Sequence, residues 1–146
     1  MDIYMDILGL KKRAEAGSLA AQTTLGACFV EGTGVGVDYE QAFKLLSGPA
    51  QRGVPAAVYY VARLHAGGLG VPQNRDAAWK LYQRAAEAGH FFAQIELARM
   101  YSKGEGVPVD RDAARKWYST AVAQDADLDD CDEELREAKA YLAPTA

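Results

Sequence analysis

The segment EGTGVGVDYE, residues 31–40, has the residue types of a phosphate-binding loop. Its glycines would let the backbone approach an anion closely, and the free N–H groups at the start of a following helix would bind that anion. A nucleotide-binding loop also places Lys with Ser or Thr beside the glycines, whereas this segment continues into Asp38 and Tyr39. Because Glu31 and Asp38 would repel phosphate, we do not interpret the segment as a phosphate site.

Histidine and cysteine are the other residue types from which a metal site or a nucleophile could be built, and the chain contains two of each. His90 has neither a cysteine nor a second histidine at metal-ligand spacing, and we expect His65 to pack in the core. Cys28 is also expected in the core, and Cys131 stands among acids that disfavour its thiolate. We therefore predict no metal, no cofactor and no catalytic residue.

The composition is that of a folded domain with one unusual segment. Of the 146 residues, 49% are hydrophobic, and the net charge is −4. Residues 125–137 contain eight acids and one base, so they carry −7 and the remainder carries +3. The other basic residues are scattered, which argues against a nucleic-acid interface.

Sequence features that bear on location favour the cytoplasm. No apolar run is long enough to span a bilayer, and the N-terminus has the reverse charge order of a secretory signal. Two cysteines are too few for the disulfide framework of a small secreted protein. We expect a soluble cytoplasmic protein that binds neither membrane nor nucleic acid, or a periplasmic one if an export signal has been removed.

The glycine-rich segment is one of three copies. Its glycines recur 36 residues later in AGGLGVPQNR at residues 66–75 and 36 later again in SKGEGVPVDR at residues 102–111, without a gap. A sustained period of this length is the signature of a solenoid. The residues that recur at this spacing are Gly32, Gly68 and Gly104; Gly34, Gly70 and Gly106; and Asp38, Asn74 and Asp110.

Each copy is predicted to contain two helices, A and B, on either side of the glycine loop. In the middle copy, Ala57, Val61 and Leu64 have the spacing of one buried helical face and predict helix A over residues 55–66. The glycines end helix A, and the Asp or Asn of each copy caps helix B. Small residues are expected where the helices approach closely; these are Gly26, Ala62 and Ala98 in helix A, and Ala42, Ala78 and Ala114 in helix B.

Both ends of the chain are predicted to carry a capping helix. Ile3, Ile7, Leu10 and Ala14 form one apolar stripe before the first copy, and Leu128, Cys131, Leu135, Ala138 and Leu142 form another after the third. We predict eight helices and no strands in a single domain. Its parts are a cap at 1–17, repeats at 18–53, 54–89 and 90–125, and an acidic cap at 126–146.

This combination of motifs resembles the Sel-one-like repeat (SLR) family, which is related to the tetratricopeptide repeats. The resemblance is carried by AAQTTLGACFVEGTGVGVDYEQAFKLL, AAVYYVARLHAGGLGVPQNRDAAWKLYQRAAEAG and FAQIELARMYSKGEGVPVDRDAARKWYSTAV, and it covers residues 14–125. The sequence departs from the family pattern at three positions. His65 stands at an aromatic position and Arg115 at an apolar one, and Asp125 stands where the first two repeats end in Gly53 and Gly89. The resemblance implies a right-handed α-solenoid of three helix-loop-helix repeats that acts as a non-enzymatic adaptor or scaffold.

The resemblance also implies a binding surface, because helix A lines the concave side of such solenoids. The expected partner-facing residues are Thr23, Ala27, Tyr59, Arg63, Phe92, Ile95, Arg99, Ser102 and Lys103. Aromatic residues and arginines dominate binding hot spots, and a guanidinium can hold the carboxylate of an acidic partner peptide. The alternative is that Tyr59 and Ile95 only pack between neighbouring repeats.

Two further questions stay open at this point. The acidic segment at residues 125–137 either binds the helix-A arginines or forms the solvated face of the last helix, and we favour the second. The preferred function is a protein-binding module, a monomer or weak dimer. The alternative is a bacterial immunity protein that blocks a toxin, and an enzyme is the remote alternative.

Overall fold

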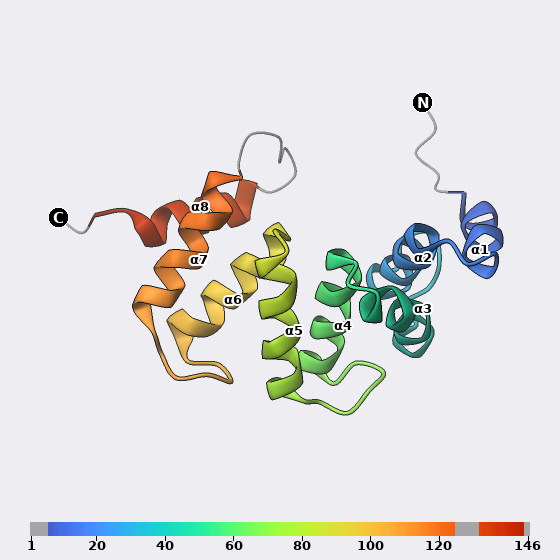
Figure 1. The fold of residues 1–146 in the computed structure, drawn as a ribbon, viewed down its shortest axis with the longest axis horizontal. Helices are drawn as coiled ribbons and strands as arrows, with labels where there is room; N and C mark the ends of the chain where they lie inside the picture. The colour runs from blue at the N-terminus through green and yellow to red at the C-terminus, as the bar shows by residue number, and fades with distance from the viewer. Residues whose placement is uncertain (1–5, 125–131, 145–146) are drawn as a thin grey trace. The chain divides into compact units, whose positions relative to one another are not determined.

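The computed structural model describes residues 6–124 and 132–144, and all regular structure within these ranges is α-helical (Figure 1). The eight helices agree with the prediction. They are α1 (Ile7–Glu15), α2 (Leu19–Glu31), α3 (Tyr39–Gln51), α4 (Pro55–Gly67), α5 (Arg75–Glu87), α6 (Phe91–Lys103), α7 (Arg111–Ala123) and α8 (Asp132–Leu142). None of the described helices is both long enough and apolar enough to cross a membrane.

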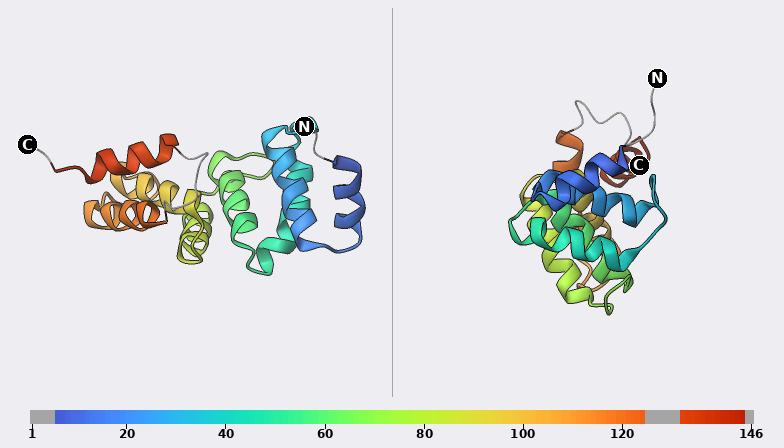
Figure 2. Two further views of the ribbon diagram at one scale, coloured as in Figure 1. Left: turned by 90° about the horizontal axis from the view of Figure 1, so that it is seen from above. Right: turned by 90° about the vertical axis from the view of Figure 1, so that its right-hand side faces the viewer.

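The chain forms two compact units, Met1–Leu81 and Tyr82–Ala146, which divide within α5. In the first unit α1 packs on α2, α2 on α3 and α3 on α4, and the two helices A, α2 and α4, also touch each other (Figure 2). In the second unit α6 packs on α7, and α7 packs on α8. Helices A and B therefore alternate along each unit, as the repeat predicts.

The glycine loops have the conformation that their spacing predicts. Gly32, Gly68 and Gly104 end helices α2, α4 and α6 in the left-handed region, with φ of 75°, 64° and 74°. The second recurring glycines, Gly34, Gly70 and Gly106, also have positive φ, at 73°, 73° and 75°. Side chains with a Cβ rarely adopt this region, so the backbone itself explains these glycines.

Helix B begins in each repeat at the predicted cap. The carboxylates of Asp38 and Asp110 accept from the backbone N–H groups of Gln41 and Ala113 at 3.1 and 3.0 Å. The amide oxygen of Asn74 accepts from the N–H of Ala77 at 3.0 Å. Each cap satisfies a donor that has no partner within its helix.

Small residues lie where helices A and B meet, as predicted. A Cβ atom on Gly26 would lie 2.5 Å from Cγ of Leu46, so α2 can approach α3 this closely only with glycine. Ala62 and Ala98 of helix A are 0% exposed. Ala42, Ala78 and Ala114 of helix B are at most 1% exposed.

The capping helices place their apolar stripes on the neighbouring repeats. Ile7, Leu10 and Ala14 of α1 pack against Leu25 and Cys28 in one cluster. In α8 the buried residues are Leu135, at 7% exposure, and Ala138, at 0%. Leu142 is half-buried, whereas the stripe residues Ile3, Leu128 and Cys131 lie outside the described residues, as does Asp125.

Two glutamines bind repeats one and three to the helix that precedes each of them, α1 and α5, which the sequence pattern did not predict. The side-chain amide of Gln22 donates to the backbone oxygen of Ala14 at 3.0 Å, and Gln94 donates to Ala86 at 3.1 Å. Gln94 is 1% exposed and also accepts from the amide of Gln124 at 3.1 Å. The burial of Gln94 is therefore compensated by hydrogen bonds.

Candidate functional site

The structure divides the expected partner-facing residues, here called the helix-A face, into buried and accessible members. Thr23 and Tyr59 are each 8% exposed, and Ile95 is 1% exposed, so these three present little surface to a partner. The hydroxyl of Thr23 donates to the backbone oxygen of Leu19 at 2.8 Å. The accessible members are the half-buried Ala27, Arg63, Phe92, Arg99 and Ser102, and the exposed Lys103.

In the first unit the helix-A face centres on Arg63 of α4. Its guanidinium donates to a carboxylate oxygen of Glu31 on α2 at 2.7 Å. The guanidinium carbon also lies 5.8 and 5.6 Å from the ring centroids of Tyr59 and Tyr60. Burial raises the pKa of Tyr60, and the charge of Glu31 raises it further. Arg63 is thus held by one carboxylate and two aromatic rings, with a third of its side chain exposed.

In the second unit the helix-A face centres on Arg99 of α6. Its Nε and Nη2 donate to the two carboxylate oxygens of Glu137 on α8, at 2.7 and 2.5 Å. Its Nη1 pairs with Glu96, three residues earlier on α6. The hydroxyl of Tyr118 on α7 donates to Glu137 at 2.7 Å. One carboxylate therefore joins α6, α7 and α8.

This network determines the charge states of its members. Hydrogen bonds from Arg99, and a further one from Tyr118, hold the pKa of Glu137 below its usual range, against the opposing effect of burial. Burial raises the pKa of Tyr118, and its hydrogen bond to Glu137 raises it further. At neutral pH the pair is therefore an ionised carboxylate and a neutral phenol.

An open hollow of about 640 Å³ surrounds the network. Three residues of the helix-A face, Arg99, Ser102 and Lys103, lie along one side of it. Tyr118 of α7 and Tyr141 of α8, whose ring centroids are 4.8 Å apart, lie on the other side. The remaining lining residues are the acids Glu96, Glu105 and Glu137. A partner would meet cationic, acidic and hydroxyl groups together with the ring of Tyr141, since Tyr118 is 2% exposed.

The residues that the sequence missed belong to α7 and α8. Glu137 was assigned to the solvated face of the last helix, and for this residue the interpretation was wrong, because Arg99 and Tyr118 bind its carboxylate. Glu133, in contrast, is exposed. Only the acidity of the segment signalled such a role, since no spacing rule links residues 38 positions apart.

The described cysteine and histidine residues pack in the interior or cap a helix. Cys28 is 3% exposed, and burial raises the pKa of its thiol. His65 packs edge-on against Phe43, with ring centroids 5.9 Å apart. Nδ1 of His90 accepts from the backbone N–H of Ala93 at 3.3 Å and caps α6. Among the described residues, no three His, Cys, Asp or Glu side chains are grouped so as to hold a metal ion.

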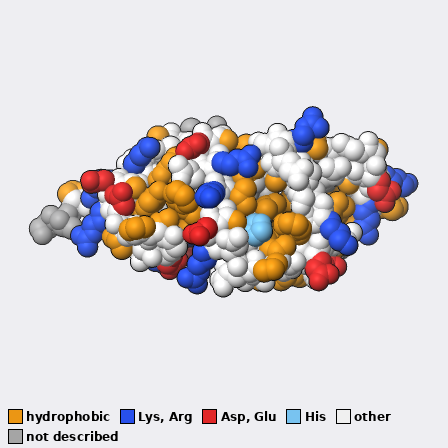
Figure 3. Space-filling view, turned by 60° about the horizontal axis from the view of Figure 1, so that its bottom comes forward, with side chains coloured by type: hydrophobic (Ala, Val, Ile, Leu, Met, Phe, Trp, Pro, Cys, Tyr) orange, Lys and Arg blue, Asp and Glu red, His pale blue; other side chains and the backbone are white. Residues whose placement is uncertain are grey.

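Charged side chains are dispersed over the face of the molecule that Figure 3 shows. On the face shown in Figure 3, lysine and arginine side chains are separated by other residues and do not form a continuous stripe. The candidate site is therefore defined by individual contacts on helices A and not by a charged surface.

Comparison with known families now accounts for the repeat. The Sel1 repeat family model matches residues 19–47, 55–90 and 92–125. The chain belongs to the Sel1 repeat family. The three matched segments coincide with the helix pairs α2 and α3, α4 and α5, and α6 and α7. Sel1 repeat proteins are generally protein-interaction modules, and their fold is typically a non-catalytic scaffold.

Solved structures of Sel1 repeat proteins share the fold of this chain. A Sel1 repeat protein from Oxalobacter formigenes is 34% identical, with a TM-score of 0.71 over 94% of this chain and 96% of that one. The protein c5321, a protective antigen of uropathogenic Escherichia coli strains with an SLR fold, is also 34% identical. Its TM-score is 0.73 over 82% of this chain and 26% of that one. Comparison with curated protein sequences finds no match.

Proposed function

We propose that this Sel1 repeat protein is a non-enzymatic adaptor that binds a partner protein or peptide through its helix-A face. The observation that carries the proposal is the hollow in the second unit, because Arg99, Ser102 and Lys103 of the helix-A face line it together. Aromatic and cationic groups around a hollow are typical of the pockets that hold binding hot spots.

The chemistry of the face favours a partner with acidic side chains. Arg63 and Arg99 each bind a carboxylate of the chain itself, Glu31 and Glu137, so both are placed to recognise carboxylates. Lys103 is exposed beside the hollow and offers a further positive charge. A partner carboxylate gains charge-assisted hydrogen bonds at these positions by replacing a glutamate of the chain, since Glu31 pairs with Arg63, and Glu96 and Glu137 pair with Arg99.

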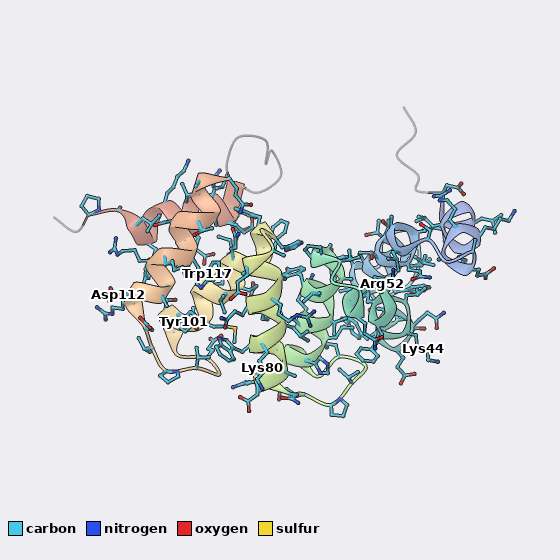
Figure 4. The ribbon with its side chains drawn as sticks, viewed as in Figure 1. Lys44, Arg52, Lys80, Tyr101, Asp112 and Trp117 are labelled. Atoms are coloured by element: carbon cyan, nitrogen blue, oxygen red, sulfur yellow. The ribbon has the colours of Figure 1, made fainter. Side chains whose placement is uncertain are left out.

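The test is capture of partners from a lysate on the immobilised full chain. The variant Arg63→Gln/Lys103→Glu removes charge from the helix-A face without altering Arg99, which holds α8. The matched control is Lys80→Glu/Arg115→Glu, which changes two exposed cations on helices B; Lys80 is labelled on α5 in Figure 4. We expect a partner that the wild type and the control retain and the helix-A variant loses.

Equal retention by all three proteins would place the binding surface elsewhere and refute the proposal. The identity of a specifically lost partner then decides between the two classes of binder. A toxin or another enzyme that the chain inhibits would assign it to the immunity proteins. A partner that stays active in the complex would assign it to the adaptors.

A further inference from the structure

A cleft of about 570 Å³ lies in the first unit, where α1 and α3 flank α2. Its floor contains the apolar side chains of Phe29 of α2 and Leu45 of α3, with Leu25, which is 3% exposed, beneath them, and Gln22 and Gln41 add polar groups to the lining. Lys11 of α1 and Lys44 of α3 stand on its rim from opposite sides, and both are exposed (Figure 4 labels Lys44). The cleft therefore combines an apolar floor with positive charge at two edges.

The cleft is separate from the helix-A face. On α2, the cleft residues Leu25 and Phe29 each lie two positions after a residue of the helix-A face, Thr23 and Ala27. Two positions correspond to about 200° around an α-helix. The cleft therefore opens on the opposite side of α2 from the helix-A face.

Gly48, in the interior of α3, leaves room in the cleft at a position where its own φ does not require glycine. Its φ is not positive, and a Cβ atom there would make only an ordinary contact, 3.8 Å from Oε1 of Gln22. Glycine weakens a helix relative to alanine, so this residue reduces helix stability. Repeats two and three have the larger Arg84 and Thr120 at the equivalent positions.

Pro49 adds a second departure at the same point. It lies inside α3, where its ring nitrogen cannot donate to the backbone oxygen of Leu45, a residue of the cleft. Glycine is the residue that best tolerates a following proline in a helix, because it has no Cβ to clash with the ring. The other repeats have Ala85 and Ala121 instead of proline. Gly48 and Pro49 are both unfavourable in the interior of a helix. Sequences that depart from local helix preferences in this way often do so at functional sites.

We propose that this cleft binds a segment of a partner protein that presents an apolar side chain with a carboxylate on each side. The apolar side chain enters between Leu25, Phe29 and Leu45, and the carboxylates meet Lys11 and Lys44. Glu15 also lies on the rim, so the net charge of the charged lining residues is +1, two lysines less one acid. This positive balance selects acidic over basic segments. The site is additional to the helix-A face and does not depend on it.

The test is an NMR titration of the isotope-labelled full chain with the peptide acetyl-Glu-Leu-Glu-amide. We expect amide shifts concentrated on Gln41, Lys44 and Leu45. The peptides acetyl-Lys-Leu-Lys-amide and acetyl-Glu-Ser-Glu-amide are controls for charge and for the apolar side chain, and both should bind more weakly. Shifts of equal size with all three peptides, shifts confined to Arg63 and Arg99, or no shifts would each overturn the proposal.

Two variants make the test independent of any single substitution. Lys11→Glu/Lys44→Glu should reverse the preference towards acetyl-Lys-Leu-Lys-amide, with a change in relative affinity of about tenfold from two exposed ion pairs. Gly48→Gln should fill the cleft and abolish the shifts, whereas Gly48→Ala, which places the same Cβ beside Pro49 but does not fill the cleft, should retain them. An unchanged charge preference in the double variant contradicts the site even if Gly48→Gln fails to fold.

Discussion

Arg99 and Glu137 are 38 residues apart in the sequence, yet the guanidinium of the first donates to both carboxylate oxygens of the second. The contact joins helix A of the third repeat to the C-terminal capping helix. Tyr118 of helix B donates to the same carboxylate. The capping helix thus adds a polar anchor to a small apolar contact, in which only Leu135 and Ala138 are buried among the described residues of α8.

Replacing Glu137 should weaken the attachment of α8. Glu137→Gln keeps the shape of the side chain but removes the charge that Arg99 binds, and both side chains are about 30% exposed. Charge-assisted hydrogen bonds with this degree of exposure are worth about 1 kcal/mol. We expect the free energy of unfolding in urea to fall by that amount. Glu133→Gln, at an exposed position of the same helix, is the control and should have no effect.

The same contact should make stability depend on acid pH. Because hydrogen bonds from Arg99 lower the pKa of Glu137 in the folded chain, its ionised form stabilises the fold. This contribution is complete above the unfolded pKa, about 4.3, and is lost as the pH falls through the folded pKa. The difference in unfolding free energy between wild type and Glu137→Gln should therefore shrink from pH 6 to pH 3. A difference that stays constant over this range contradicts the assignment.

Two glycines with positive φ should differ in their response to alanine. Gly53 has φ of 79° and open space where a Cβ atom would lie, so Gly53→Ala should cost about 1 kcal/mol from backbone strain alone. At Gly70, with φ of 73°, a Cβ atom would lie 2.7 Å from the backbone carbon of Tyr39. Gly70→Ala should cost about 3 kcal/mol, because overpacking adds to the strain. Urea unfolding of both variants measures the difference. Equal losses of unfolding free energy would show that the loop at Gly70 moves away from Tyr39 and relieves the contact.

His90 should make the start of α6 sensitive to pH. Its Nδ1 can cap the helix only when the ring is neutral, and burial lowers its pKa. The folded state therefore binds fewer protons, so the contribution is complete above the unfolded pKa, about 6.5, and is lost as pH falls through the folded value. We expect the wild type to lose about 1 kcal/mol between pH 7.5 and pH 5 from this residue.

The matched variant for this prediction is His90→Ser, because Ser18 caps α2 at the equivalent position of the first repeat. Serine keeps a cap acceptor that does not titrate. The loss of stability between pH 7.5 and pH 5 should therefore be smaller in His90→Ser than in the wild type. Parallel pH profiles for the two proteins would be evidence against a neutral imidazole cap.

The sequence was most informative where the structure is local. Asp38, Asn74 and Asp110 cap the helices that follow them because an N-cap bond spans only three residues. The left-handed glycines were likewise predictable, since their conformation depends on the chain nearest to them. Their recurrence at a fixed period then predicts stacked helix pairs, because each pair must bury its apolar face on the next.

The candidate site was predictable only in part. Helical spacing placed Arg63 and Arg99 on one face of helices A, but spacing does not reveal which groups neighbouring helices bring to that face. Tyr59 and Ile95 are buried, which no single helix pattern distinguishes from partner-facing exposure. Glu137, Tyr118 and the cleft at Gly48 depend on contacts between helices that the sequence pattern does not specify.

The sequence by itself determined the eight helices, their caps and the repeat, because hydrogen bonds within helices and turns link residues a few positions apart. Only the tertiary structure decided that the carboxylate of Glu137 binds Arg99 and Tyr118, and that Gly48 lines a cleft where α1 and α3 flank α2. The physical reason is range. A salt bridge or cleft depends on how helices pack against one another, and residues 38 positions apart meet only through that packing.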